Sequence, residues 1–286
     1  MAVLTAQRLD LRPLPGGLGA EVLHQQVAEI DDRLFPAVYQ AFLDHQLLLF
    51  RDQDLPPERQ AAFARRFGEV QIHVMNQYHL SGHPELYYLS NLGPDSRPSG
   101  KHPDRGTLVW HTDGSWRERT GQVTILYAER IPSFGGETWF ADMYAAYDAL
   151  PPAERRRLEG LRARHNLDFS RSRRHGEDPM TEAQRLATPP VEHPVVRTHP
   201  ETGRKVIFLG DHAECIVGLP YDEGRALVEE INARAVADAR RFCQKWRPRD
   251  LILWDNRCLL HKAEPYDALH EARVIRRCTV LGERPR

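Results

Sequence analysis

Apolar residues change their spacing from one segment of the chain to the next, and the spacing predicts short strands with helices between them. Residues 46–50 contain an unbroken apolar run, which is typical of a buried strand. After a pair of prolines, residues 56–67 instead carry apolar side chains on one side of a predicted helix. We predict further helices at residues 31–43, 144–150, 153–161 and 222–239, and further strands at residues 9–14, 20–23, 85–91, 108–116, 122–129, 137–141, 194–198, 205–210, 240–244, 251–254 and 274–281.

This order of elements predicts a mainly β protein with flanking helices. Short strands recur along the chain and helices lie between and outside them, which favours two packed sheets. We expect one domain over residues 1–286 with a double-stranded β-helix core, also called a jelly roll or cupin-like core. Residues 93–105 are rich in Pro, Gly, Asp and Ser and predict a lid loop. Residues 165–193 are polar and arginine-rich, and we expect a solvated, mobile loop there.

Composition narrows the function classes. The 286 residues include 39 Lys and Arg against 40 Asp and Glu, a net charge of -1, and this balance argues against a nucleic-acid partner. The 4 cysteines form no Cys-X-X-Cys pair, so we expect a reduced, cytoplasmic protein rather than a disulfide framework. The sequence carries no recognisable signal peptide and no apolar stretch of membrane-spanning length, so we expect no membrane partner.

Three residues of types that bind metals occur near two of the predicted strands. His111 and Asp113 are two residues apart, so on a strand both side chains face the same way. His261 follows the strand predicted at residues 251–254. Two imidazoles and one carboxylate with open coordination positions form the facial triad of non-haem Fe(II) oxygenases. A solvated polar pair, a Zn(II) or Mn(II) hydrolase of the cupin type, and a binding protein with an inactive metal site are the alternatives.

Arginines near the C-terminus extend this chemistry. Arg273 and Arg277 are four residues apart and share a face of a regular strand, whereas we expect Arg276 to point into solvent. A guanidinium binds a carboxylate through two parallel hydrogen bonds. An iron oxygenase that draws two electrons from a 2-oxo acid needs such a group to hold the far carboxylate of that cosubstrate.

Several motifs together resemble the TauD/TfdA family of Fe(II)- and 2-oxoglutarate-dependent dioxygenases. The resemblance covers nearly the whole chain, and within the family it is closer to the aryloxyalkanoate enzymes than to the taurine enzymes. The motifs that carry it are Trp110–Asp113, Pro132–Thr138, Trp254–Arg257 with His261, and Arg273 with Arg277. The stretches similar to the aryloxyalkanoate enzymes are Asp142–Leu150, Pro194–His199, Gly218–Pro220 and Asp255–His261.

The resemblance implies roles for individual residues. His111, Asp113 and His261 match the iron ligands, and Thr138 and Arg273 match the pair that holds 2-oxoglutarate. Thr138 also fits a plain strand residue, and His73 fits an interior histidine as well as a pocket residue. Asn76 stands where the taurine enzymes have tyrosine, which argues against taurine as substrate. The expected substrate-binding residues are Arg277, His73, Asn76, Ser115 and Trp116, the last two because they follow the metal ligands directly.

The activity implied is hydroxylation of a small organic anion. Fe(II), 2-oxoglutarate and O2 are the expected cofactor and cosubstrates, with succinate and CO2 as products. An aryloxyalkanoate or another carboxylate is the expected substrate, and a sulfonate or an alkyl sulfate is the alternative within the family. A cupin-type metal hydrolase is the more distant alternative. Relatives of this kind are often dimers or tetramers, so we expect a homo-oligomer.

Overall fold

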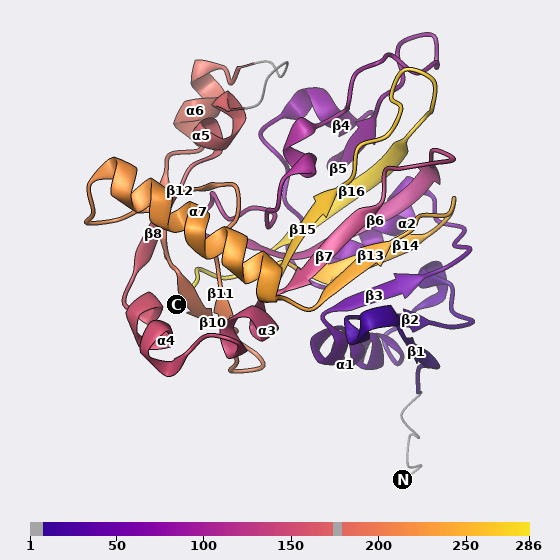
Figure 1. Ribbon diagram of the computed structural model, residues 1–286. Coiled ribbons are helices and arrows are strands. Elements are labelled where there is room, and N and C mark those ends of the chain that lie inside the picture. Colours follow the sequence, from indigo (N-terminus) through magenta and orange to yellow (C-terminus); the bar gives the residue numbers. More distant parts are fainter. Residues whose placement is uncertain (1–7, 174–178) are drawn as a thin grey trace.

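The largest element of the fold is an eight-stranded sheet, seen in the computed structural model, which describes residues 8–173 and 179–286 (Figure 1). All four residues of β3 are fully buried, as expected for an unbroken apolar run covered on both faces. All neighbouring strands in this sheet run antiparallel except the parallel pair β2 and β3. In spatial order the strands are β1 (Leu11–Pro13), β2 (Ala20–Val22), β3 (Leu47–Phe50), β14 (Leu251–Asp255), β6 (Gly121–Arg130), β16 (Val274–Leu281), β5 (His83–Ser90) and β4 (His79–Leu80).

The two faces of this sheet enter separate cores. On β14, Leu251 and Leu253 pack with residues of α1 (Phe35–His45) and α2 (Pro57–Arg65), whereas Trp254 faces the opposite way. This is the alternation that a strand imposes on successive side chains. Each fully buried leucine stabilises the fold by about 1.5–3 kcal/mol relative to an exposed one, so both faces contribute. The helices therefore cover one face, and the other is free to form a site.

A three-stranded sheet packs across that second face. It consists of β13 (Arg241–Gln244), β7 (Thr138–Asp142) and β15 (Leu259–Ala263), all antiparallel. The rings of Phe140 and Trp254, both fully buried, meet edge to face at 5.2 Å between the two sheets. The short helix α3 (Met143–Asp148) follows β7 directly. The predicted mainly β architecture with flanking helices is confirmed.

The segment from α4 to α7 forms a second group of elements on one side of the large sheet (Figure 1). We call it the side module. It contains a three-stranded sheet in the order β12-β8-β9, the hairpin β10-β11 and four helices. The bounds are α4 (Pro152–Glu159), β8 (Arg162–His165), α5 (Leu167–Ser172), α6 (Glu182–Ala187), β9 (Val191–Pro194), β10 (Val196–Thr198), β11 (Lys205–Ile207), β12 (Ala213–Ile216) and α7 (Tyr221–Asp238).

The prediction of a long loop at residues 165–193 was wrong for most of that range. Asn166 caps α5, and Thr181 forms a capping box with Gln184 at the start of α6. His165 and His193 are fully buried on β8 and β9, so polar residue types occupy inward positions of these strands beside the small Ala163. Apolar spacing does not reveal such strands. Residues 174–178 lie outside the described part of the chain.

The prediction that Arg276 points into solvent was also wrong. It alternates with Arg277 on β16 as expected, but it is buried on the helix-covered face rather than solvated. Its Nε atom lies 3.0 Å from a carboxylate oxygen of Glu129, and its guanidinium lies over the ring of Tyr127 at 4.6 Å. It also donates to the carbonyl of Leu55. Alternation fixes the face of a side chain, whereas the elements that cover the face decide its burial.

The remaining connections include four short 3-10 turns and the predicted lid loop. The turns are η1 (Pro15–Gly17), η2 (Val27–Glu29), η3 (Asn76–Tyr78) and η4 (Arg105–Leu108). Residues 93–104 form no helix or strand, apart from one isolated bridge between Leu92 and Pro98. The 4 cysteines all lie in the described part, and all are free thiols.

Among residues 8–173 and 179–286, no helix combines the length and the apolar character needed to cross a bilayer.

Candidate metal centre

His111, Asp113 and His261 come together between the two sheets, with one ligand atom of each within 4.8 Å of the others. His261 lies on β15, but residues 109–113 form no regular strand, so the predicted strand through His111 and Asp113 was wrong. A single bridge attaches this loop to β15: the backbone N–H of His111 donates to His261 O at 3.0 Å, and that of His261 donates back at 2.8 Å. Tertiary pairing, rather than a local strand, thus aligns the two imidazoles.

The loop turns sharply after Asp113, and glycine permits the turn. Gly114 has φ of 72°, in the left-handed region, and a Cβ there would lie 2.8 Å from the backbone nitrogen of Gly121. The N–H of Gly121 in turn donates to the carbonyl of Asp113 at 3.2 Å. The turn directs the Asp113 side chain toward both histidines.

The orientation of the three side chains suits one divalent cation. Nδ1 of His111 lies 2.7 Å from the carbonyl of Val109, which leaves Nε2 to face the carboxylate of Asp113. Nε2 of His111 and Nε2 of His261 each lie 3.8 Å from a different Asp113 oxygen. Two imidazoles and a carboxylate, with the remaining positions open, form the donor set typical of non-haem Fe(II).

The protonation states also fit metal binding. Burial by itself raises the pKa of Asp113, but Arg277 and the two imidazoles outweigh it and hold that pKa well below its usual range. Burial, reinforced by His111, moves the pKa of His261 well below its ordinary value. A carboxylate that stays ionised and an imidazole that stays neutral are the forms that ligate a metal.

Two further residues hold Asp113 in place. The hydroxyl of Thr124 donates to Oδ2 of Asp113 at 2.6 Å. Asn256 accepts from the backbone N–H of Asp113 at 3.2 Å and donates to Thr124 Oγ1 at 2.9 Å. The indole of Trp254 donates to the same Asn256 oxygen at 2.9 Å. Partners of this kind orient a metal ligand and are expected to tune its affinity.

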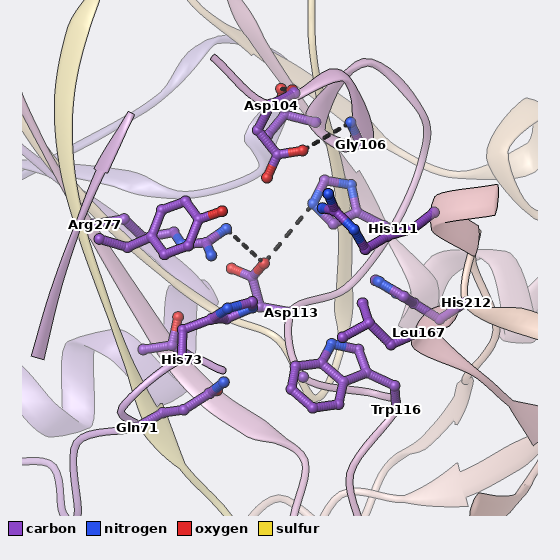
Figure 2. Close-up of a pocket in the computed structure, with 15 residues that line it drawn as sticks. Gln71, His73, Asp104, Gly106, His111, Asp113, Trp116, Leu167, His212 and Arg277 are labelled. Atoms are coloured by element: carbon purple, nitrogen blue, oxygen red, sulfur yellow. Dashed lines mark hydrogen bonds and ion pairs between the residues drawn. The ribbon is translucent and has the colours of Figure 1, made fainter. Parts of the chain in front are cut away.

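Two of the metal ligands, His111 and Asp113, border a pocket of about 500 Å³ that opens to solvent. In Figure 2, Arg277, His73 and Gln71 lie on one side of Asp113, and His212 and Leu167 lie on the other. The residues that line it are Gln71, His73, Tyr87, Asp104, Gly106, Thr107, His111, Asp113, Gly114, Trp116, Leu167, Arg171, His212, Arg277 and Thr279.

Arg277 faces this pocket from β16. Its Nη1 atom lies 3.4 Å from Oδ1 of Asp113, and its guanidinium lies over the ring of Tyr87 at 4.4 Å. Burial lowers the pKa of Arg277, but Asp113 more than offsets this, so the net shift is upward. The side chain is therefore a fixed cation at the wall of the pocket.

Thr138 and Arg273 are not among the residues that line this pocket. Thr138 is buried at the start of β7 and accepts from the indole of Trp246 at 3.0 Å, while none of the described residues accepts its own hydroxyl hydrogen. Arg273 is buried and donates to the carbonyl of Gly136 at 3.3 Å. Burial lowers the pKa of Arg273 to about 10, so it remains charged at neutral pH.

No described carboxylate forms an ion pair with Arg273, and its printed side-chain partner is the neutral carbonyl of Gly136. A buried charge without a counter-charge is strongly unfavourable, which is the situation expected at a site for an anionic ligand.

Of the five residues predicted to bind the substrate, Arg277 and two others line the pocket, and the remaining two do not. His73 and Trp116 line the pocket, and their rings meet at 5.6 Å. Burial and the nearby Arg277 lower the pKa of His73 to about 3. Ser115 is buried but does not line the pocket, and Asn76 is exposed on η3 and does not reach it either. The η3 turn carries Asn76 outward, an effect that counting residues from His73 does not reveal.

Several lining residues were not predicted from the sequence. Gln71 precedes His73 by two positions, and this same-face spacing was the one signal available for it. Tyr87 shares one face of β5 with Leu89, a spacing that marks it only as inward-facing. Leu167 and His212 come from the side module, and no local pattern connects them to the metal ligands.

Comparison with known proteins places these features in context. The sequence matches the family model described as taurine catabolism dioxygenase TauD, TfdA family, over residues 10–279. It is 36% identical over 286 residues to the (S)-phenoxypropionate/alpha-ketoglutarate-dioxygenase of Sphingobium herbicidovorans, covering 96% of this chain and 95% of that protein. It is 38% identical over 248 residues to the alpha-ketoglutarate-dependent 2,4-dichlorophenoxyacetate dioxygenase of Cupriavidus pinatubonensis, covering 84% and 86%.

A solved structure agrees with these matches. The crystal structure of AAD-2 in complex with Mn(II) and N-oxalylglycine superimposes on this fold with a TM-score of 0.82 at 31% identity. The match covers 98% of this chain and 99% of that chain.

Proposed function

The chain belongs to the TauD/TfdA dioxygenase family, and we propose that its substrate is a small organic carboxylate of the aryloxyalkanoate class. It is a non-haem iron dioxygenase that uses Fe(II), 2-oxoglutarate and O2. The observation that carries the substrate proposal is Arg277, a buried cation that faces the pocket beside the metal ligands. The (S)-phenoxypropionate and 2,4-dichlorophenoxyacetate enzymes supply the substrate class.

In this proposal the chain has two separate anion sites, one for 2-oxoglutarate and one for the carboxylate of the substrate. His111, Asp113 and His261 hold the iron, and Thr138 with Arg273 holds the far carboxylate of 2-oxoglutarate. A ferrous ion and 2-oxoglutarate held there would supply the activation of O2 needed to hydroxylate a substrate C–H, with succinate and CO2 as the other products. Arg277 orients the substrate by its carboxylate, because a guanidinium matches that group in two parallel hydrogen bonds.

The pocket walls favour an aryl group on the rest of the substrate. Trp116 and Tyr87 provide aromatic surface, and Leu167 adds an apolar contact beside them. His73 stays neutral at physiological pH, so it adds no charge to this wall. An aryloxyalkanoate combines one carboxylate with one apolar ring, which matches these walls.

The finer predictions on architecture and setting remain part of the proposal. The two facing sheets support a double-stranded β-helix in a single domain. Asp104 lines the pocket from the end of residues 93–105, which supports their role as a lid. Four free thiols support a reduced, cytoplasmic setting, and a dimer or tetramer remains the expected assembly.

An alkyl sulfate or a sulfonate is the alternative within the family, because Arg277 binds those head groups as well. A hydrolase of the cupin type has no need of the charge at Arg273. Succinate release with phenoxyacetate, phenoxyacetamide, octyl sulfate and taurine separates these classes. We expect phenoxyacetate to be turned over and its uncharged amide to be inactive; equal turnover of the two contradicts recognition by the anion.

A further inference from the structure

Gln71 is a buried amide that nothing so far explains. It lies two residues before His73, and its backbone N–H donates to the carbonyl of Thr279 on β16 at 2.7 Å. The residue is only 6% exposed. Its side chain forms no hydrogen bond with any residue that the structure describes, although it lines the pocket on the same side as Arg277 (Figure 2).

Gln71 shares its part of the pocket wall with Arg277. Both residues also line a small adjoining hollow, together with His73, Tyr87 and Thr279. An amide that lines a pocket and has no protein partner among the described residues is expected to bond to water or to a ligand there.

We propose that Gln71 is a specificity-determining residue that donates from Nε2 to the carboxylate of the substrate, beside Arg277. This inference rests on the proposed function and deepens it. Arg277 shares Nη1 with Asp113 at 3.4 Å, so its guanidinium is not wholly available to the substrate. A carboxylate offers about four acceptor positions, more than one arginine satisfies. A neutral amide adds donors without a second positive charge on this wall.

The consequence is a preference for carboxylates over uncharged analogues that exceeds what Arg277 gives by itself. Gln71→Met keeps the volume of the side chain and removes its donors. The KM for phenoxyacetate should rise about tenfold or more, as for the loss of a hydrogen bond to a charged group, while kcat changes less. Gln71→Glu places a negative charge against the carboxylate of the substrate, so its KM for phenoxyacetate should exceed that of Gln71→Met. The ratio of phenoxyacetate turnover to phenoxyacetamide turnover should also be lower in Gln71→Glu than in the wild type.

Controls separate recognition from folding. Gln77→Glu makes the same charge change on the same segment, but Gln77 is exposed and outside the pocket, so KM should not change. The anaerobic visible absorption band of the Fe(II)–2-oxoglutarate complex should remain in both Gln71 variants, because their substituted side chain lies on the substrate side. Gln71→Asn retains the amide one methylene further back and should show a smaller rise in KM than Gln71→Met.

The outcomes are distinguishable. An unchanged KM for phenoxyacetate in Gln71→Met overturns the role of Gln71 and leaves the proposed function standing. Loss of the absorption band or of the folded state in all three Gln71 variants assigns Gln71 to the framework and also overturns its role in recognition. Absence of turnover by the wild-type enzyme with every carboxylate tested overturns the proposed function, and the assignment of Gln71 with it.

Discussion

The pocket has two walls of different construction. The sheet wall is defined here as Gln71, His73, Tyr87, Arg277 and Thr279. Tyr87 lies on β5, Arg277 and Thr279 lie on β16, Gln71 is bonded to Thr279 through its backbone, and the carbonyl of His73 accepts from His79 on β4. The module wall consists of Leu167, Arg171 and His212, which come from the side module. The sheet wall belongs to a ladder of consecutive strands, whereas the module wall comes from short helices and loops joined to the sheet by tertiary packing.

This difference in construction indicates which wall binds charged groups and which wall contacts the variable part of the substrate. Arg277 and Thr279 take their direction from the pleat of β16, so their positions follow from sheet register. Leu167 instead packs in a small cluster with Trp116 and Met180. Side chains on a rigid sheet are suited to hold charged groups in place, and those on a connecting segment are suited to vary with substrate shape. We therefore expect the largest functional losses at the metal centre and on the sheet wall.

The largest effect is expected on removal of the Asp113 carboxylate, which lies between the two walls (Figure 2). Asp113→Ala leaves only the two imidazoles as ligands, and we expect succinate release to fall below detection while the fold is retained. Circular dichroism and a Co(II) titration of the apoprotein check folding and metal binding separately. Turnover at the wild-type rate would refute the assignment of the triad.

The next test addresses the cation of the sheet wall. Arg277→Met should raise KM for phenoxyacetate by about 10–100-fold, because a hydrogen bond to a charged group contributes roughly 1.5–3 kcal/mol. The anaerobic absorption band of the 2-oxoglutarate complex should persist, since Arg273 holds that cosubstrate. The paired variant Arg273→Leu should weaken 2-oxoglutarate instead. If the two variants exchange these effects, the roles of the two arginines are reversed.

A third test weakens the support of Asp113 without touching a ligand. Thr124→Val removes the hydroxyl that donates to Oδ2 of Asp113, and we expect metal affinity to fall by about 10–100-fold. Thr124→Ser keeps the hydroxyl and should restore most of the affinity. Calorimetric titration with Co(II) measures both variants. Equal affinities for valine and serine at this position would show that the hydrogen bond is not what holds the carboxylate.

The smallest effect concerns stability of the side module rather than catalysis. Burial lowers the pKa of His193 to about 4, whereas the unfolded chain binds this proton near the ordinary value of about 6.5. Because the unfolded state binds more protons between these values, the free energy of unfolding should fall with decreasing pH over that window, by up to about 1.4 kcal/mol per pH unit for this group.

Urea unfolding at pH 7.5 and pH 5.5 measures this dependence. His193→Asn should show a smaller difference between the two pH values than the wild type. His24→Asn is the matched control, because the His24 side chain is 84% exposed. A pH dependence in His193→Asn equal to that of the wild type would mean that His193 does not contribute.

The sequence by itself determined the strands of the large sheet except β4, the residue types of the triad and the inward direction of Arg277 on β16. Each of these depends on a local rule: apolar runs mark covered strands, and side chains alternate along them. His111 and Asp113 were paired correctly by proximity in sequence, but for the wrong reason, because a turn at Gly114 rather than a strand directs them.

Only the tertiary structure decided which other residues reach the pocket. Asn76 was expected there and is exposed, while Gln71 and Leu167 were not expected and line it. Arg276 was expected in solvent, yet Glu129, Tyr127 and the helix-covered face bury it. Local spacing fixes the direction of a side chain from its own element. The element that packs against it is often distant in sequence, and that packing decides whether the side chain meets solvent, core or ligand.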